Sequence, residues 1–202
     1  MGWSASWIAV KGASKETVLS HLALVETGEA VSPGTRRTGL CCTELSGGWL
    51  VVFSEDFDWA NNGRLIDVSR FGLALACRFE DKVEMTSELS AAEAGVERWR
   101  VFHNSVGSIY RLDVTGDPPA ELASIRDRAF QVQAEEGGED AGVDLVHDVP
   151  LDLGKAVCGY RSDEFGVAFA ALHGDPAKGS VQPRKPGLID RLFAPFRSRT
   201  SA

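Results

Sequence analysis

Residues 73–80 read LALACRFE, an almost unbroken apolar run between Gly72 and the charged pair Asp81-Lys82. A short apolar run bounded in this way is typical of a strand that is buried on both faces. We therefore predict that residues 73–80 form an interior strand of a β-sheet, and the rest of the fold can be followed outward from it.

Further strands are expected on both sides of this run. Alternating polar and apolar residues after it predict strands with one solvated face, and Ser46-Gly47-Gly48 before it predicts a hairpin turn. In chain order, the other expected strands are residues 5–11, 40–45, 49–56, 82–91, 96–104, 108–116, 143–150 and 165–174.

Helices are expected between these strands, over residues 14–24, 60–72, 117–136 and 150–161. The third is the best defined, because prolines lie in its first turn and an apolar stripe follows at helical spacing. The residues of that stripe are Leu122, Ile125, Ala129 and Val132.

This order of elements predicts an α+β fold, with a mostly antiparallel twisted sheet and three to four helices. Strand–helix passages recur at residues 6–24, 49–71 and 143–160, which leaves an internal βαβ-type duplication open. One globular domain is expected over residues 1–174. Residues 175–187 are rich in Pro and Gly and are expected to be a flexible linker before a short amphipathic segment, residues 188–202.

The charge of the chain is uneven. The net charge is −8, but residues 175–202 contain six Lys or Arg and two Asp, a net charge of +4, so residues 1–174 carry −12. An acidic body argues against nucleic acid as a partner, because contacts with phosphate dominate such binding. No apolar run approaches the roughly 18 residues of a membrane span.

The four cysteines show no metal-binding spacing and no CxxC motif, and they are expected to be free thiols in a reducing cytoplasm. Cys41 and Cys42 are adjacent on an expected strand, so they point to opposite faces. No nucleotide-binding, hydrolase or metalloprotease motif occurs. We therefore expect no metal and no cofactor.

Two groups of residues are weak candidates for a ligand site. Asp56, Asp58 and Trp59 lie in the polar stretch SEDFDWANNG, which lacks the full oxygen set of a calcium loop and is better explained as a helix cap by Asn61 or Asn62. The second group is His147 and Cys158, which with Asp148 offer a base, a nucleophile and an orienting carboxylate.

Arg98, Arg100 and Phe102 are expected on one face of the strand RWRVFHN, with Trp99, Val101 and His103 on the other face. Arginine interleaved with aromatic residues can stack on a base or bind a phosphate. In an acidic protein, the favoured interpretation is an amphipathic strand whose arginines pair with carboxylates and whose Trp99 enters the core.

The C-terminal segment is the main candidate for a partner site. Its apolar residues recur at helical spacing, and a helix this short has to dock on something to be ordered. Docking on its own body, on another protein or a second copy, and weak peripheral contact with a membrane all stay open. The candidate residues are Leu188, Ile189, Leu192, Phe193 and Phe196.

The opening MGWSASWIAVKG, together with GWLVVFSEDFD, resembles a bacterial protein family with no assigned activity. The resemblance covers most of residues 1–174, implies a soluble bacterial protein and assigns no functional residue. We expect a cytoplasmic, non-enzymatic binding or accessory protein, similar to an immunity protein or an adaptor. The alternative is a small-ligand-binding protein or a hydrolytic enzyme with an unrecognised cleft.

Overall fold

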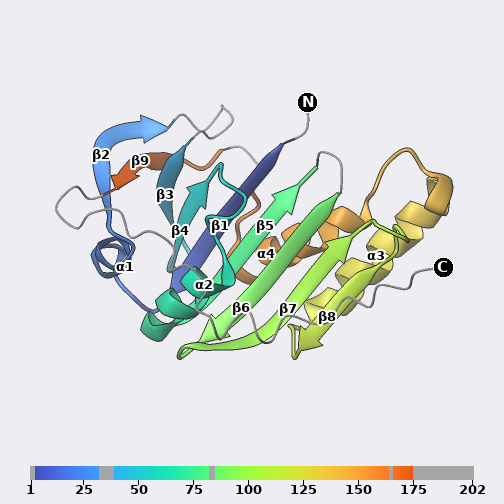
Figure 1. The fold of residues 1–202 in the computed structure, drawn as a ribbon, viewed down its shortest axis with the longest axis horizontal. Coiled ribbons are helices and arrows are strands. Elements are labelled where there is room, and N and C mark those ends of the chain that lie inside the picture. The colour runs from blue at the N-terminus through green and yellow to red at the C-terminus, as the bar shows by residue number, and fades with distance from the viewer. Residues whose placement is uncertain (1–2, 32–38, 82–84, 164–165, 175–202) are drawn as a thin grey trace, which may run out of the picture.

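The run LALACRFE lies in the interior of a nine-stranded antiparallel sheet, as strand β5 (Leu73–Glu80), beside the central strand β1 (Ser4–Lys11) (Figure 1). The computed structural model describes residues 3–31, 39–81, 85–163 and 166–174. The strand order is β2-β9-β3-β4-β1-β5-β6-β7-β8. The other strands are β2 (Leu24–Val31), β3 (Leu40–Leu45), β4 (Trp49–Ser54), β6 (Thr86–Glu93), β7 (Val96–Asn104), β8 (Leu112–Gly116) and β9 (Phe169–Gly174).

Helices cover both faces of the sheet. Helices α1 (Lys15–His21) and α2 (Asn62–Val68) lie on one face, and α3 (Glu121–Glu135) and α4 (Val149–Cys158) lie on the other (Figure 1). Three short 3-10 helices are also described. Ser69–Phe71 follows α2, Gly138–Asp140 follows α3, and Val146–Asp148 precedes α4. None of the described helices is long and apolar enough to cross a membrane. The predicted α+β class is confirmed.

The sheet separates two apolar cores, and successive strand residues alternate between them as the side-chain period of two requires. Trp7, Phe53 and Leu75 pack under α3 and α4, whereas Ile8 and Val52 pack under α1 and α2. The adjacent Cys41 and Cys42 likewise belong to different cores, as predicted.

Helix α2 makes a crossover connection. Strands β4 and β5 both run antiparallel to β1, so they are parallel to each other, and α2 joins them across β1. Helix α1 similarly links β1 to the distant strand β2 on the same face. Of the three predicted strand–helix passages, residues 6–24 and 49–71 each contain a strand followed by a helix, and residues 143–160 do not.

The predicted strand at residues 143–150 is wrong. Residues 146–148 form a 3-10 helix that leads directly into α4, where Val146, Val149 and Leu153 are buried at helical spacing. Strand β2 was not predicted: Leu24 was expected to end a helix, and no element was expected over residues 25–30. It escaped prediction because its middle, Glu26 to Glu29, is exposed and has no apolar alternation.

The predicted apolar stripe of α3 is rotated. Leu122, Ile125 and Ala129 pack against the core as expected, but Val132 is 37% exposed. The helix instead buries the polar residue Gln133 completely. The sheet is also unevenly covered: α2 packs on β5 and β6, and no described helix lies over β7 and β8 on that face (Figure 1).

Candidate functional site

The candidates Asp56, Asp58 and Trp59 lie in the turn between β4 and α2. The Ser6 hydroxyl donates to the main-chain oxygen of Asp56 at 2.6 Å, and an Asp56 side-chain oxygen accepts from the main-chain N–H of Asp58 at 2.9 Å. The Trp59 ring lies 4.6 Å from the guanidinium of Arg64. These groups shape the turn.

Asn61 ends this turn and begins α2. Its side-chain oxygen accepts from the main-chain N–H of Arg64 at 3.0 Å, and its own backbone is extended. This is the geometry of an N-cap, so the helix-cap interpretation of SEDFDWANNG is confirmed. Among the described residues, no group of three His, Cys, Asp or Glu side chains is arranged to hold a metal ion.

His147 and Cys158 do not meet. They lie at opposite ends of α4, about 15 Å apart along its axis. The Cys158 thiol donates to the main-chain oxygen of Gly154 at 3.1 Å, and burial raises the pKa of Cys158 to about 11. Because a nucleophile needs its base within hydrogen-bond reach, these two residues do not form a catalytic pair. They also lie on the opposite side of the sheet from Asp56, Asp58 and Trp59.

Cys158 does line a surface depression of about 860 Å³. The depression lies between the β3–β4 hairpin and the end of α4, and Lys11 and Thr43 are among the polar residues that line it. The Lys11 amine lies 5.8 Å from the centre of the Trp49 ring. The Cys42 thiol is on the other face, where burial and the charge of Glu26 raise its pKa to about 12.

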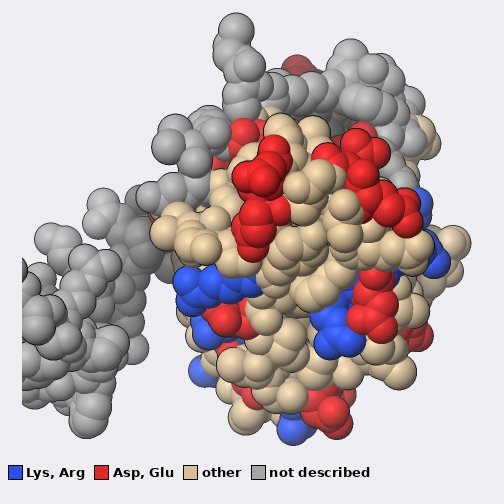
Figure 2. Space-filling view, turned by 90° about the vertical axis from the view of Figure 1, so that its right-hand side faces the viewer, with Lys and Arg blue, Asp and Glu red and all other residues tan. Residues whose placement is uncertain are grey.

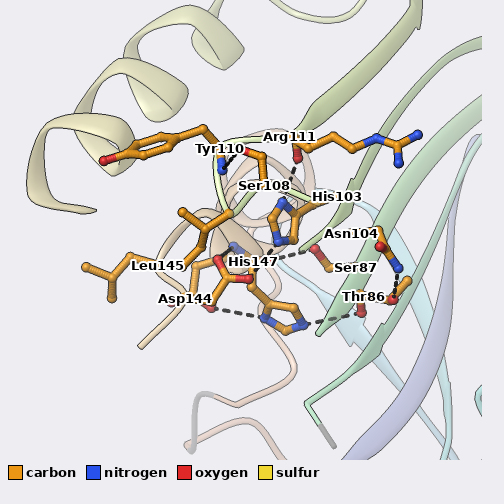
Figure 3. Close-up of polar contacts among 12 residues, drawn as sticks. Thr86, Ser87, His103, Asn104, Ser108, Tyr110, Arg111, Asp144, Leu145 and His147 are labelled. Atoms are coloured by element: carbon orange, nitrogen blue, oxygen red, sulfur yellow. Dashed lines mark hydrogen bonds and ion pairs between the residues drawn. The ribbon is translucent and has the colours of Figure 1, made fainter. Parts of the chain in front are cut away.

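A buried polar cluster joins the sheet to the segment before α4. His103 of β7 is fully buried, and Figure 3 shows it between Arg111 and Asp144. Its Nδ1 is 2.7 Å from the main-chain oxygen of Arg111, and its Nε2 is 2.8 Å from Oδ2 of Asp144. Both ring nitrogens of His103 are therefore taken up by contacts within the protein.

His147 extends this cluster. Its main-chain N–H donates to Asp144 at 3.0 Å, its Nε2 is 3.2 Å from the main-chain oxygen of Thr86, and its own main-chain oxygen accepts from the Ser87 hydroxyl at 2.7 Å (Figure 3). Both histidines are thus used to hold backbone and carboxylate partners. Since neither ring nitrogen of the buried His103 is open to a substrate, we assign the cluster a structural role.

Gln133 of α3 fastens the same segment from the other side. Its Nε2 donates to the main-chain oxygens of Gly138 and Val143, both at 3.1 Å, and its Oε1 accepts from the main-chain N–H of Leu145 at 2.7 Å. Sequence reasoning missed Gln133 and Asp144, since their partners lie in elements that only the tertiary fold brings together.

The other polar arrangement lies on the face of β7 and β8 over which no described helix packs. The predicted alternation of β7 is confirmed: Trp99, Val101 and His103 are buried, Arg98 and Arg100 are exposed, and Phe102 is half-buried. Each arginine was expected to pair with a carboxylate. The Arg98 guanidinium does so with Glu93 at 3.4 Å, but Arg100 has no ion pair with any described carboxylate.

Two neighbours extend this face. On β5, Arg78 contacts Glu88 at 3.0 Å and stacks 5.2 Å from the Phe57 ring. Beside β7, Arg111 contacts Asp113 of β8 at 2.9 Å. The face therefore carries several guanidinium groups and two aromatic rings, those of Phe57 and Phe102.

The main predicted partner site, Leu188, Ile189, Leu192, Phe193 and Phe196, lies outside the described residues. Comparison of the chain with protein-family models, with curated proteins and with solved structures found no match. The resemblance to a bacterial family of unknown activity therefore stays a prediction, and function is inferred from the residues of the chain itself.

Proposed function

We propose that this chain is a cytoplasmic, non-enzymatic binding protein, similar to an immunity protein or an adaptor, and that it holds a protein partner on the face of β7 and β8 over which no described helix lies. The partner surface is one that presents carboxylates around an apolar contact. The observation that carries this proposal is Arg100, which is exposed and without an ion-pair partner among the described residues, next to the half-buried Phe102.

Arginine and aromatic residues are enriched at protein interfaces and supply much of their binding energy. A guanidinium that is not already neutralised can form a bidentate pair with a carboxylate of the partner. The flanking Arg98 and Arg111 are paired with Glu93 and Asp113, so they offer guanidinium N–H donors that need little further ordering.

The test is photo-crosslinking in the source cells, with a benzophenone side chain at position 102. A discrete adduct with another protein is expected, and Arg100→Glu should abolish it because the carboxylates of the partner would then be repelled. The same probe at position 132, an exposed site on α3, is the matched control. The proposal fails if position 102 gives no adduct, or if both positions capture the same proteins equally.

The alternative function is binding of a small ligand, and the depression beside Cys158 favours it over the other internal candidates. Its wall combines the Trp49 ring with the charge of Lys11. Ligand-observed NMR against a fragment library tests this alternative. Hits that are lost in Lys11→Ala but kept in Lys155→Ala would support it, and hits insensitive to Lys11→Ala would exclude it.

The C-terminal segment is proposed as a second binding element, on the strength of its sequence alone. Its four apolar residues at helical spacing and its net positive charge suit docking on the acidic body or on a protein partner. Deletion of residues 186–202 separates these cases. If the segment docks on the body, its deletion should lower the melting temperature and leave the adducts from position 102 unchanged. If it docks on a partner, its deletion should leave the melting temperature unchanged and alter the adducts.

A further inference from the structure

The sheet has two outer strands, β2 and β8, and neither pairs on its outer side with a further described strand. Unpaired edges invite pairing with another chain, and soluble proteins usually protect them with charges, bulges or prolines. Strand β2 has such protection. Its pairing with β9 is interrupted between Glu26 and Ala30, Gly28 has a φ of +83°, and Glu26 and Glu29 charge the edge.

Strand β8 has less of that protection, because its one glycine of positive φ, Gly116 at +72°, is its last residue. It pairs with β7 in one regular register over all five residues, from Leu112 to Gly116, without a bulge. It contains no Lys and no Pro, and the charge of Asp113 is balanced by Arg111. Val114, at its centre, is 44% exposed. The side of the molecule that carries β8 and α3 faces the viewer of Figure 2, and Asp and Glu side chains gather in the upper part of that view.

We propose that β8 pairs with β8 of a second copy of this chain, antiparallel and centred on Val114, so that two sheets join into one. When two identical strands pair antiparallel, a two-fold axis relates the two copies. Two-fold symmetry is the commonest symmetry of homodimers. This inference is independent of the partner proposed for the open face of the sheet.

Charge complementarity selects both the occupant and the register. Centred on Val114, the pairing sets Val114 against Val114 and Asp113 against Thr115 of the other copy. Arg111, just before the strand, and Asp117, just after it, then lie toward the same end of the paired strands, so opposite charges flank both ends of the pairing. Registers centred on Asp113 or on Thr115 would set acidic residues against each other, Asp113 against Asp113 or Asp113 against Asp117.

The first test is the mass of the full chain in solution, measured by sedimentation equilibrium over a dilution series. The expected mass approaches twice 21.7 kDa at high concentration. Val114→Lys should weaken association roughly tenfold or more, because it opposes two charges at the centre of the pairing. Val96→Lys adds the same charge at a 56% exposed valine away from β8, and it should leave association unchanged.

The second test reads the register directly. Directly opposed residues of an antiparallel pair lie about 4.5–5.5 Å apart at Cα, within the range of a disulfide. Val114→Cys should therefore form a covalent dimer on mild oxidation, whereas Val96→Cys should not. The background is low because all four native cysteines are buried. A monomer at every concentration would overturn the proposal, and so would a dimer that survives Val114→Lys and leaves Val114→Cys uncrosslinked.

Discussion

Replacing Gln133 by leucine tests how the segment before α4 is held. The side chain of Gln133 is fully buried and makes three hydrogen bonds to main-chain groups of Gly138, Val143 and Leu145. Leucine fills most of the volume but leaves two carbonyls and one N–H without that partner. A buried polar group left unpaired costs about 1–3 kcal/mol. Because the segment is near the surface, water relieves part of this cost.

The expected loss is about 3–4 kcal/mol in the free energy of unfolding. For a chain of this size it corresponds to a fall of roughly 10 °C in melting temperature. Urea unfolding followed by tryptophan fluorescence measures it. Amide hydrogen exchange should also show faster opening of residues 138–148 in the variant, because the network no longer fastens them.

The matched control is Gln131→Leu, two residues earlier on the same helix. Gln131 is exposed, and its amide donates only to Glu135, at 2.9 Å. Its replacement should change the free energy of unfolding by less than about 0.5 kcal/mol. The reasoning is refuted if Gln133→Leu unfolds within about 1 kcal/mol of the parent chain, or if both variants lose the same stability.

Three further outcomes are expected. Burial alone would raise the pKa of Asp148, but its hydrogen bond with His147 and the charge of Arg161 outweigh burial and hold that pKa below the usual 3.8. The stabilisation by Asp148 is therefore complete above about pH 5 and is lost as pH falls through 4 and below, so acid titration of stability should be shallower in Asp148→Asn. Ellman's reagent should find almost no reactive thiol in the native chain and four after unfolding in guanidinium, since all four cysteines are buried. Gly154→Ala should destabilise by about 1–3 kcal/mol in thermal unfolding, despite better helix propensity, because its Cβ would lie 3.0 Å from the Trp7 ring.

The elements that sequence patterns predicted well are those whose burial follows the local period. LALACRFE and the alternating β7 were recognisable because each residue's environment is set by its own strand. Strand β2 was missed because an edge strand needs little apolar surface, and its pairing with β9 depends on residues about 140 positions later. The segment at 143–150 was predicted as a strand because its valines are typical of strands. The same valines also fit the buried face of a helix, and periodicity over so few residues does not separate the two.

The candidate sites were harder to predict for a physical reason. The strand pattern placed Arg100 and Phe102 on the correct face of β7. It could not show that no described helix covers this face, because that depends on where α2 packs. His103 and Asp144 are 41 residues apart, and no spacing rule links them. The predicted buried stripe of α3 included Val132 and not Gln133. A glutamine is expected on the buried face of a helix only when its hydrogen-bond partners are known.

The position of β9 between β2 and β3 has a consequence for biosynthesis. Strands β5 to β8 follow one another both in the chain and in the sheet, so they can pair as soon as they leave the ribosome. Strand β2 has no such neighbour. Its only described partner, β9, is made some 140 residues later, and until then the apolar edge of β3 stays open. The seven strands from β3 to β8 in the sheet order can therefore pair during synthesis, whereas β2 and the outer edge of β3 wait for Phe169–Gly174 and are the part that a chaperone would have to shield.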